Sequence, residues 1–413
     1  MALALDGGMT ASPSPIRPSP LAGRRVLDLS RVLAGPWCTM ILADLGAEVI
    51  KVEAPGSGDD TRAWGPPWAA GESAYYLCAN RTKKSVEIDL SCAAGQAAVR
   101  ALAAQSDVVV ENFKLGGLDK YGLDYASLAA LNPRLVYCSI SGYGRDGPLA
   151  ALPGYDYVIQ AAGGLMSING GRDEPPVRVG VAVADLFTGM TAAQAVLAAF
   201  IAADRDGVGQ HIDLALYDCQ LAMLANVGSG VLVSGDDAPR WGNQHPTVVP
   251  YQTFETADGV VVIAVGNDRQ FAILMGMLGA DSLAADQRFA TNGARVVNRD
   301  ALIGRLIPEV RARTTSWWLD ALATAGVPGG PVRSVAEALA SPEALARNMV
   351  RRVVHPAAGQ VDLVVSPIKL SGTPVTDPVA PPLLGEHSAD VLGHLLGYSI
   401  DEVSAAAGGR ART

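Results

Sequence analysis

The chain has 413 residues, of which 49% are hydrophobic and 18% are charged, and its net charge at pH 7 is −9. This length can bury more than one core, and the acidic balance disfavours a nucleic-acid-binding protein. The most apolar stretch, at 191–203, is too short to cross a membrane and ends in Asp204-Arg205-Asp206.

Residues 1–20 are rich in Ser, Pro, Gly and Ala and have no basic segment followed by an apolar one. We expect a disordered extension there, not a secretory signal. The five cysteines form no Cys-x-x-Cys pair, and the five histidines show no metal-ligand spacing. Buried free thiols in a reducing cytoplasm, and no metal site, are therefore expected.

From residue 21 onward, short apolar runs alternate with helical patterns, which is typical of a parallel sheet with helices on both faces. We predict a large Rossmann-like α/β domain over 21–233, although the chain has neither the Gly-x-Gly-x-x-Gly fingerprint nor a Walker loop. The predicted strands are 26–29, 48–53, 108–111 and 135–141, and the predicted helices are 36–45, 93–105, 125–131 and 218–232.

The pattern changes after a linker at 234–249. A hairpin of 251–255 and 260–265 and a helix after Asn267, with Gln270 placed for a capping box, predict a smaller α+β domain over 250–331. The last segment, 332–413, contains two strands and a helix near 388–396. We expect it to return to the large domain.

Asp185 lies between an apolar strand-like stretch and a very apolar helix. The unpaired N–H groups and the dipole at the helix start would keep its carboxylate ionised, and a poorly hydrated carboxylate can act as a nucleophile. The alternative is a simple helix cap, which is the commoner role of such an Asp.

Other polar residues have two interpretations each. Lys83-Lys84, Asn112 and Lys120 follow successive sheet elements, where ligands bind, yet most lysine pairs only solvate a loop. The phenol of Tyr155 either points into the site or belongs to the core. The segment 240–246 is either a flap over the site or an ordinary linker.

Several segments together resemble one enzyme family, the class III CoA-transferases of the formyl-CoA transferase and carnitine CoA-transferase type. The runs at 56–67, 240–242 and 249–252 are most similar to the succinate–hydroxymethylglutarate (glutarate) CoA-transferases. The segments that match in order are 26–62, 80–85, 110–113, 141–144, 154–156, 184–185 and 382–387.

The resemblance implies that Asp185 carries CoA as an aspartyl thioester from an acyl-CoA, such as succinyl-CoA, to a carboxylic acid, and that the acceptor is a dicarboxylate such as glutarate or hydroxymethylglutarate. No metal or redox cofactor is needed. It also implies an interlocked homodimer. Residues expected to contact CoA on this basis are Leu33, Ala34, Lys84, Ile88, Asn112, Phe113, Lys120, Gly154, Tyr155 and Asp156.

Two features qualify the resemblance. Formyl-CoA transferases hold the CoA nucleotide with an arginine where this chain has Ala54, so Lys84, Lys120 or Arg62 would have to replace it. From the flap position, we expect Arg240, or His245 when protonated, to meet the distal carboxylate of the acceptor.

Three rival functions are open. The related acyl-CoA racemases carry His where this chain has Tyr155, and a phenol is poorly matched to abstracting a proton near neutral pH. The missing glycine fingerprint disfavours a nicotinamide-dependent oxidoreductase. In a non-catalytic acyl-CoA-binding protein, Asp185 would only cap its helix.

Overall fold

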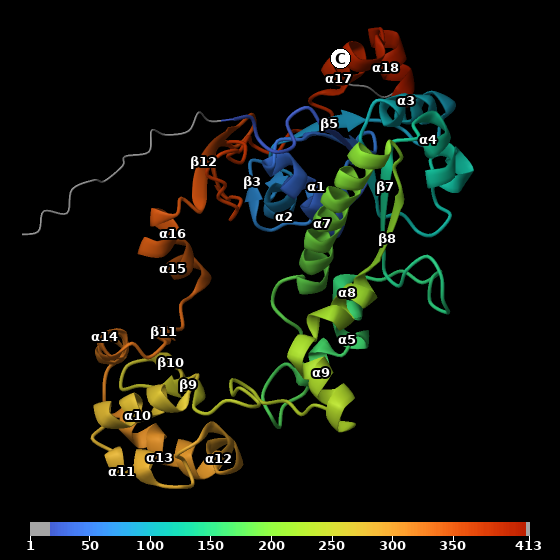
Figure 1. The fold of residues 1–413 in the computed structure, drawn as a ribbon. Helices are drawn as coiled ribbons and strands as arrows, with labels where there is room; N and C mark the ends of the chain where they lie inside the picture. Colours follow the sequence, from blue (N-terminus) through green and yellow to red (C-terminus); the bar gives the residue numbers. More distant parts are fainter. Residues whose placement is uncertain (1–16, 410–413) are drawn as a thin grey trace, which may run out of the picture. The chain divides into compact units, whose positions relative to one another are not determined.

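The computed structural model describes residues 17–409, which form two compact units (Figure 1). The first unit contains residues 17–163, 181–225 and 345–409, and the second contains 164–180 and 226–344. These units differ from the predicted boundaries, because 226–249 and the glycine-rich 164–180 belong to the second unit.

The expected disordered extension was placed too far along the chain. Residues 1–16 lie outside the described residues, but Arg17 N–H donates to Gly372 O at 3.2 Å and Ser19 Oγ donates to Pro374 O at 2.7 Å. The ordered part of the first unit therefore begins before residue 20.

A six-stranded parallel sheet forms the centre of the first unit. Its strand order is β5-β2-β1-β6-β7-β8, which is the doubly wound Rossmann order when the six strands are counted along the chain. The predicted parallel α/β architecture is confirmed. The strands are β1 (Arg25–Asp28), β2 (Glu48–Glu53), β5 (Lys83–Glu87), β6 (Val108–Glu111), β7 (Val136–Ser141) and β8 (His211–Ala215).

Alternating strand residues fill two cores, one on each face of the sheet. Val26 of β1 packs with α1 and α7, whereas Leu27 packs with α3, α4, α17 and α18. Helices α17 and α18 contact α3, and Figure 1 shows them beside it. The helices of this unit are α1 (Ala34–Asp44), α2 (Ala74–Ala79), α3 (Ala93–Ala104), α4 (Tyr125–Leu131), α5 (Asp156–Ala162), α7 (Val183–Asp206), α8 (Leu216–Met223), α17 (Ser388–Leu396) and α18 (Ile400–Ala406).

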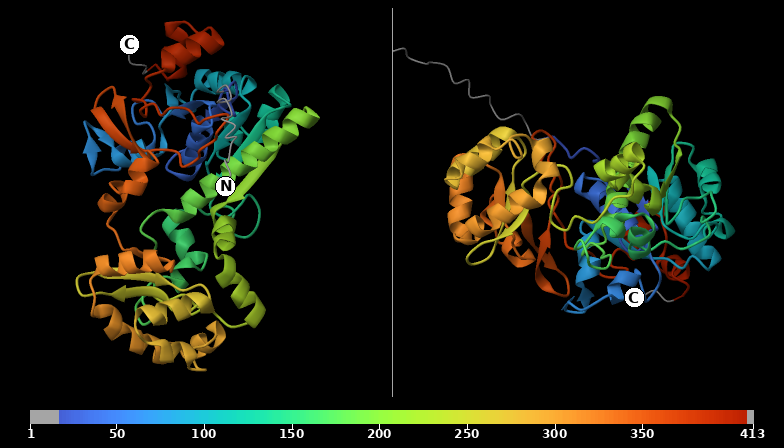
Figure 2. Two further views of the ribbon diagram at one scale, coloured as in Figure 1. Left: turned by 60° about the vertical axis from the view of Figure 1, so that its left-hand side comes forward. Right: turned by 90° about the horizontal axis from the view of Figure 1, so that it is seen from below.

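Smaller elements complete the first unit. The hairpin of β12 (Val350–His355) and β13 (Gly359–Val364) packs on α2 and β3 through Val353, Leu363 and Leu77 (Figure 2). The remaining elements are β3 (Trp68–Ala69), β4 (Glu72–Ser73) and the 3₁₀ turns η1 (Asp60–Ala63) and η2 (Asp119–Tyr121).

Helix α7 (Val183–Asp206) is longer than the apolar stretch 191–203. Among single helices within 17–409, it alone is long and apolar enough to cross a membrane. Its buried residues, including Ala192, Val196 and Phe200, belong to the core that also contains α1. This is the position of a core helix.

The predicted helix 218–232 is broken into α8 and α9 (Ala225–Ser234). Ala225 has a φ of 44°, in the left-handed region, so the α-helical path is interrupted there. An uninterrupted apolar pattern gave no sign of this break.

The second unit is built around a three-stranded antiparallel sheet, in the order β11-β10-β9. Asn267 caps α10 as predicted, but Gln270 Oε1 accepts from the N–H of Gly266 and not from that of Asn267. The elements are β9 (Tyr251–Glu255), β10 (Val260–Ala264), β11 (Gly329–Pro331), α6 (Leu165–Ile168), α9, α10 (Asp268–Met277), α11 (Asp281–Ala285), α12 (Asn292–Val297), α13 (Arg299–Arg311), α14 (Thr315–Ala325) and α15 (Val335–Leu339), with α16 (Pro342–Ala346) at the unit boundary.

Candidate active site

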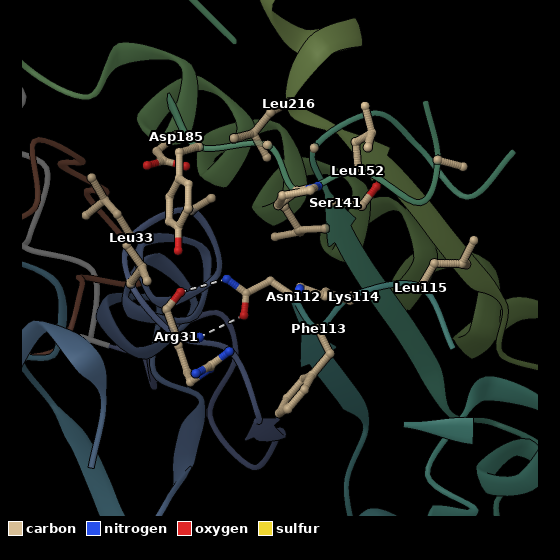
Figure 3. Close-up of a pocket in the computed structure, with 18 of the residues that line it drawn as sticks. Arg31, Leu33, Asn112, Phe113, Lys114, Leu115, Ser141, Leu152, Asp185 and Leu216 are labelled. Atoms are coloured by element: carbon tan, nitrogen blue, oxygen red, sulfur yellow. Dashed lines mark hydrogen bonds between the residues drawn. The ribbon is translucent and has the colours of Figure 1, made fainter. Parts of the chain in front are cut away.

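A cavity of about 180 Å³ lies in the first unit at the carboxyl ends of β1, β6 and β7. This is the edge at which ligands bind in doubly wound sheets. Figure 3 shows Asp185 and Leu216 at one end of the cavity and Phe113 at the other, with Arg31 and Asn112 between them.

Asp185 is the third residue of α7, and its side chain does not cap that helix. The N-cap position is Ala182, and the cap acceptor comes from another helix. Asp156 Oδ1 accepts from the N–H groups of Ala184 at 2.8 Å and of Asp185 at 3.3 Å. The interpretation of Asp185 as a simple cap is therefore wrong, because Asp156 performs that role.

Asp156 is fixed in this role. It is the first residue of α5, it is buried, and its Oδ2 accepts from Gln160 Nε2 at 2.7 Å. Its carboxylate therefore faces the start of α7 and is not among the groups that line the cavity. The family resemblance implied that Asp156 contacts CoA, but its carboxylate instead binds the N–H groups at the start of α7.

The environment raises the pKa of Asp185 to about 7, first because the carboxyl is largely buried and then because the charge of Asp156 lies nearby. The sequence predicted the opposite effect, an ionised carboxylate stabilised by the helix start. The difference arises because Asp156 already occupies the N–H groups that would have stabilised it.

Six of the predicted CoA contacts line the same cavity as Asp185. Gly154 also packs against Gly142, where a Cβ on either residue would lie within 2.6 Å of backbone atoms of the other, so this wall requires two glycines. The six residues are Leu33, Ala34, Asn112, Phe113, Gly154 and Tyr155.

A second cavity, of about 260 Å³, adjoins the first, because Arg31 and Phe113 line both. Ile88, which the sequence assigned to CoA, lies in its wall with Ala54 and Tyr121. The first unit thus offers a continuous binding surface from Asp185 to the end of β5.

The lysine pair Lys83-Lys84 does not lie at the carboxyl ends of the strands, where it was expected. Lys83 and Lys84 are the first residues of β5, so they lie toward the amino end of the sheet. Lys84 Nζ pairs with Glu48 at 2.8 Å, and buried Lys83 pairs with Asp28 at 3.1 Å. Neither lysine lines either cavity.

Lys120 lies beside the second cavity, with its Nζ 4.6 Å from the ring centroid of Tyr121. The phenol ring of Tyr121 is itself part of the cavity wall. Arg62 also contacts this wall, because it pairs at 2.8 Å with buried Glu53, which lines the second cavity. Of the cations considered for the nucleotide, Lys120 and Arg62 therefore both lie beside the cavity.

Asn112 holds the loop between β1 and α1. Its Oδ1 accepts from the N–H of Arg31 at 2.9 Å, and its Nδ2 donates to the carbonyl of Arg31 at 2.7 Å (Figure 3). Its amide thus shapes the cavity wall by clamping the backbone.

A buried ion pair supports the same loop. Lys51 Nζ lies 2.8 Å from Asp59 Oδ2 and donates to the carbonyl of Ser30 at 2.8 Å, and Asp59 accepts from the N–H of Val32 at 3.2 Å. The φ of Val32 is 70°, an unfavourable value for a β-branched residue. These contacts hold a strained wall in place.

Two aromatic residues, Tyr75 and Trp64, were not predicted from the sequence to belong to the site. Burial, and then the charge of Asp185, raise the pKa of Tyr75 to about 12, so this phenol lies within electrostatic reach of the carboxylate and stays protonated. The ring of Trp64 contacts Tyr75 edge-on, with centroids 5.3 Å apart. The run 56–67 contributed to the family resemblance but was not considered part of the site.

Gly163 and Gly189 allow close packing between elements of the first unit. A Cβ on Gly189 would lie 2.6 Å from the carbonyl oxygen of Ala34, and one on Gly163 would lie 2.4 Å from Gln220 Cγ. Gly163, Gly164 and Gly189 do not line the cavity.

Arg240 and His245 belong to the second unit. Arg240 donates to the carbonyls of Ser167 and Gly171, each at 3.2 Å. The His245 ring lies 5.1 Å from that of Tyr251, and its Nδ1 accepts from the N–H of Thr247. These contacts fix both side chains within their own unit.

Within the described part of the chain, no group of three or more His, Cys, Asp and Glu residues could hold a metal ion. No disulfide joins the five cysteines. Cys38, Cys138 and Cys219 are buried as expected, but Cys78 is exposed and Cys92 is half-buried.

Known proteins share this sequence and fold. The chain is 48% identical over 387 residues to a succinate–glutarate CoA-transferase of Agrobacterium fabrum, which covers 92% of this chain and 97% of that protein. It is 42% identical over 379 residues to the human succinyl-CoA:glutarate CoA-transferase, covering 92% and 86% respectively. A crystal structure of a CAIB/BAIF family protein from Brucella suis, 46% identical, superimposes with a TM-score of 0.82 over 92% of this chain and 100% of that chain.

The family model for CoA-transferase family III matches residues 21–388. This range contains Asp185 and both cavities, and it confirms the resemblance on which the site was predicted. The chain is a member of CoA-transferase family III and an enzyme of that class.

Proposed function

We propose that this enzyme transfers CoA from succinyl-CoA to glutarate or a similar dicarboxylic acid, with Asp185 as the nucleophile. The observation that carries the proposal is a largely buried carboxylate with no hydrogen-bond partner among the described residues, at the end of a cavity lined by the predicted CoA contacts. The relatives named above act on this donor and acceptor.

The two adjoining cavities suit an extended CoA thioester. The thioester would lie at Asp185, the pantetheine arm along Arg31 and Phe113, and the nucleotide in the second cavity at Ile88. Ala54 lines this second cavity, so the missing arginine leaves space there, and the nearby cations are Lys120 and the lining residues Arg31 and Lys51.

The reaction consists of two matched halves. The Asp185 carboxylate attacks the thioester carbonyl and expels the CoA thiolate, which leaves a mixed anhydride. The thiolate then attacks the aspartyl carbonyl, releases the first acid and forms an aspartyl-CoA thioester. The acceptor carboxylate then attacks the aspartyl thioester and expels the CoA thiolate, which leaves a second mixed anhydride. The thiolate attacks the acceptor's carbonyl in this anhydride, so the acceptor becomes the new acyl-CoA and the Asp185 carboxylate is regenerated. These steps require no metal or redox cofactor.

The start of α1 can stabilise the negative charge that develops on the reacting carbonyl oxygen. Leu33 is the N-cap, no side chain caps this helix, and Leu33 and Ala34 both line the cavity with Asp185. Uncapped N–H groups at a helix start are suitable donors to an oxyanion. In contrast, Asp156 occupies the start of α7.

We further propose that the enzyme works as a homodimer in the cytoplasm, with the interlocked arrangement that the family resemblance implies. Helix α9 supports a second copy, because it is apolar yet has no buried residue, and Leu232 and Val233 are 88% and 89% exposed. A large apolar surface on a folded chain is typical of an interface.

Substitution of the nucleophile tests the function. We expect Asp185→Asn to lower the transfer rate by at least about a thousandfold, because an amide cannot form the anhydride. Asp206→Asn, at the exposed end of the same helix, should leave the rate unchanged. Near wild-type transfer by Asp185→Asn, with a normal circular dichroism spectrum for both variants, would overturn the assignment.

A further inference from the structure

Arg31 lies at the junction of the two cavities of the first unit. Among residues 17–409 it is the one cationic side chain that lines both of them, and Phe113 is the other residue they share. The remaining cationic lining residues belong to one cavity each, Lys114 to the first and Lys51 to the second. Figure 3 shows the Arg31 side chain extending toward the Phe113 end of the first cavity, away from Asp185.

The position of Arg31 is fixed by its neighbours. Asn112 is hydrogen-bonded to both the N–H and the carbonyl of Arg31. The next residue, Val32, is held with a φ of 70° and donates its N–H to buried Asp59 at 3.2 Å. The guanidinium carbon of Arg31 lies 5.4 Å from the ring centroid of Phe113. An arginine that is already held in this way loses little conformational freedom when it binds a ligand.

The ion pair of Arg31 can be exchanged for a ligand. Its Nη1 donates to Asp60 Oδ2 at 3.1 Å, and the two side chains are 47% and 51% exposed. An ion pair this exposed is weak. Lys51, in contrast, is fully buried and is held by Asp59 at 2.8 Å and by the carbonyl of Ser30. Of the two cations in the wall of the second cavity, Arg31 is therefore the one that can turn toward a ligand.

A diphosphate is the group that reaches this junction. In CoA the diphosphate joins the pantetheine arm to the adenosine, so an arm in the first cavity and an adenosine in the second leave it between them. A guanidinium forms paired hydrogen bonds with phosphate oxygens. A phosphate that leaves water beside the Phe113 ring also needs a cation.

We propose that Arg31 binds the diphosphate of CoA and exchanges Asp60 for it. This proposal rests on the proposed function, which places the thioester at Asp185 and the nucleotide in the second cavity. Because the acyl-CoA donor and the acyl-CoA product carry the same diphosphate, Arg31 contributes equally to the binding of both. Its loss should therefore change binding and KM more than kcat.

Isothermal titration calorimetry with CoA and two of its fragments tests the proposal. Dephospho-CoA keeps the diphosphate but lacks the 3′-phosphate, and pantetheine has no phosphate. In Arg31→Gln we expect the Kd of CoA and of dephospho-CoA to rise by the same factor, about tenfold or more, with that of pantetheine unchanged. Asp60→Asn should lower the Kd of CoA and of dephospho-CoA by about two- to fivefold, because it removes the competing carboxylate.

Arg134→Gln is the matched control, because Arg134 also forms an exposed ion pair, with Asp204 at 3.3 Å, and lines neither cavity. It should leave the Kd of all three ligands unchanged.

Four results would overturn the proposal. The Kd of CoA stays unchanged in Arg31→Gln, or the loss is confined to CoA, which would place Arg31 at the 3′-phosphate. Pantetheine loses affinity as much as CoA does, which would show a disturbed loop and not a phosphate contact. Asp60→Asn raises the Kd of CoA, which would contradict the exchange. A wild-type protein that binds CoA without transferring it to glutarate would instead overturn the proposed function, since calorimetry requires no transfer.

Discussion

Two neighbouring carboxylates have different tasks at the start of α7. Asp156 accepts the N–H groups of the helix, and Asp185 is left largely buried without a hydrogen-bond partner among the described residues. The helix start therefore positions Asp185 without neutralising it. A nucleophile that is not stabilised by hydrogen bonds gives up little when it attacks a thioester.

The pH dependence of transfer should reflect this environment. Since the pKa of Asp185 is about 7, the attacking carboxylate forms as the pH rises through 7, and kcat at saturating succinyl-CoA should rise over the same range. Asp156→Asn retains an oxygen acceptor for the helix but removes the nearby negative charge, so the midpoint should move to lower pH. Tyr75, whose pKa burial and the charge of Asp185 raise to about 12, stays protonated throughout.

A pH–rate profile of both proteins from pH 5 to 9 checks this prediction. If the midpoint stays in place in Asp156→Asn while the variant folds normally, Asp156 only caps the helix. Lys84→Gln, at the amino end of the sheet, serves as the control and should keep the wild-type midpoint.

The same carboxylate should destabilise the folded protein at high pH. The pKa of Asp185 is higher in the folded chain than its ordinary value of 3.8, so its ionisation opposes folding. This effect is absent below pH 4, grows as the pH rises to 7 and is constant above. Asp185→Asn should therefore exceed the wild type in stability by about 2–4 kcal/mol at pH 8 and by less at pH 5. Urea unfolding at both pH values measures the difference, and an equal difference at each pH would contradict the account.

At the scale of the elements, short apolar patterns predicted the sheet well. The bounds of β2, β6 and α4 agree with the predicted 48–53, 108–111 and 125–131, because each of these elements lies between clear turn or polar signals. The break between α8 and α9 was missed, since Ala225 adopts a left-handed conformation that its residue type does not signal.

Residues of the candidate site that follow strand ends were predicted from local pattern alone. Asn112 and Phe113 come directly after β6 and were found, whereas Lys84 was misplaced because its strand begins at Lys83. Tyr75 and the capping role of Asp156 depend on contacts between helices distant in sequence, such as that of α5 with α7. No local pattern carries that information.

The contact between α1 and α7 links helix packing to the site. Gly189 of α7 packs on the carbonyl oxygen of Ala34, which lines the cavity, and a Cβ would lie 2.6 Å from that oxygen. Gly189→Ala should therefore push the helices apart, destabilise the protein by about 1–3 kcal/mol and lower transfer. Gly304→Ala, in the interior of α13 with open space around its Cβ, should be neutral or stabilising by up to about 1 kcal/mol. Thermal unfolding distinguishes the two, and equal effects would contradict the packing argument.

At the scale of the whole molecule, one apolar helix stays exposed in the described chain. The hydrophobic fraction of 49% fits extensive burial, yet α9 has no buried residue. The unit boundaries could not be predicted, because the second unit takes 164–180 from the middle of the first and only the three-dimensional contacts show this.

The proposed homodimer gives a prediction at this scale. Leu232→Glu places a charge on the exposed apolar face of α9, so it should shift the protein from dimer toward monomer in sedimentation velocity. Val297→Glu, on α12 and 84% exposed, is the control and should sediment as the wild type does. A wild-type protein that sediments as a monomer would remove the proposed dimer.

The central claim is that Asp185 forms a covalent bond with CoA. Mass spectrometry of the peptide containing Asp185, from enzyme mixed with succinyl-CoA and quenched in acid, tests it most directly. We predict a CoA thioester on Asp185 that disappears when glutarate is added before the quench and is absent from Asp185→Asn. Transfer to glutarate without any adduct on Asp185, or with the adduct on another residue, would contradict the account.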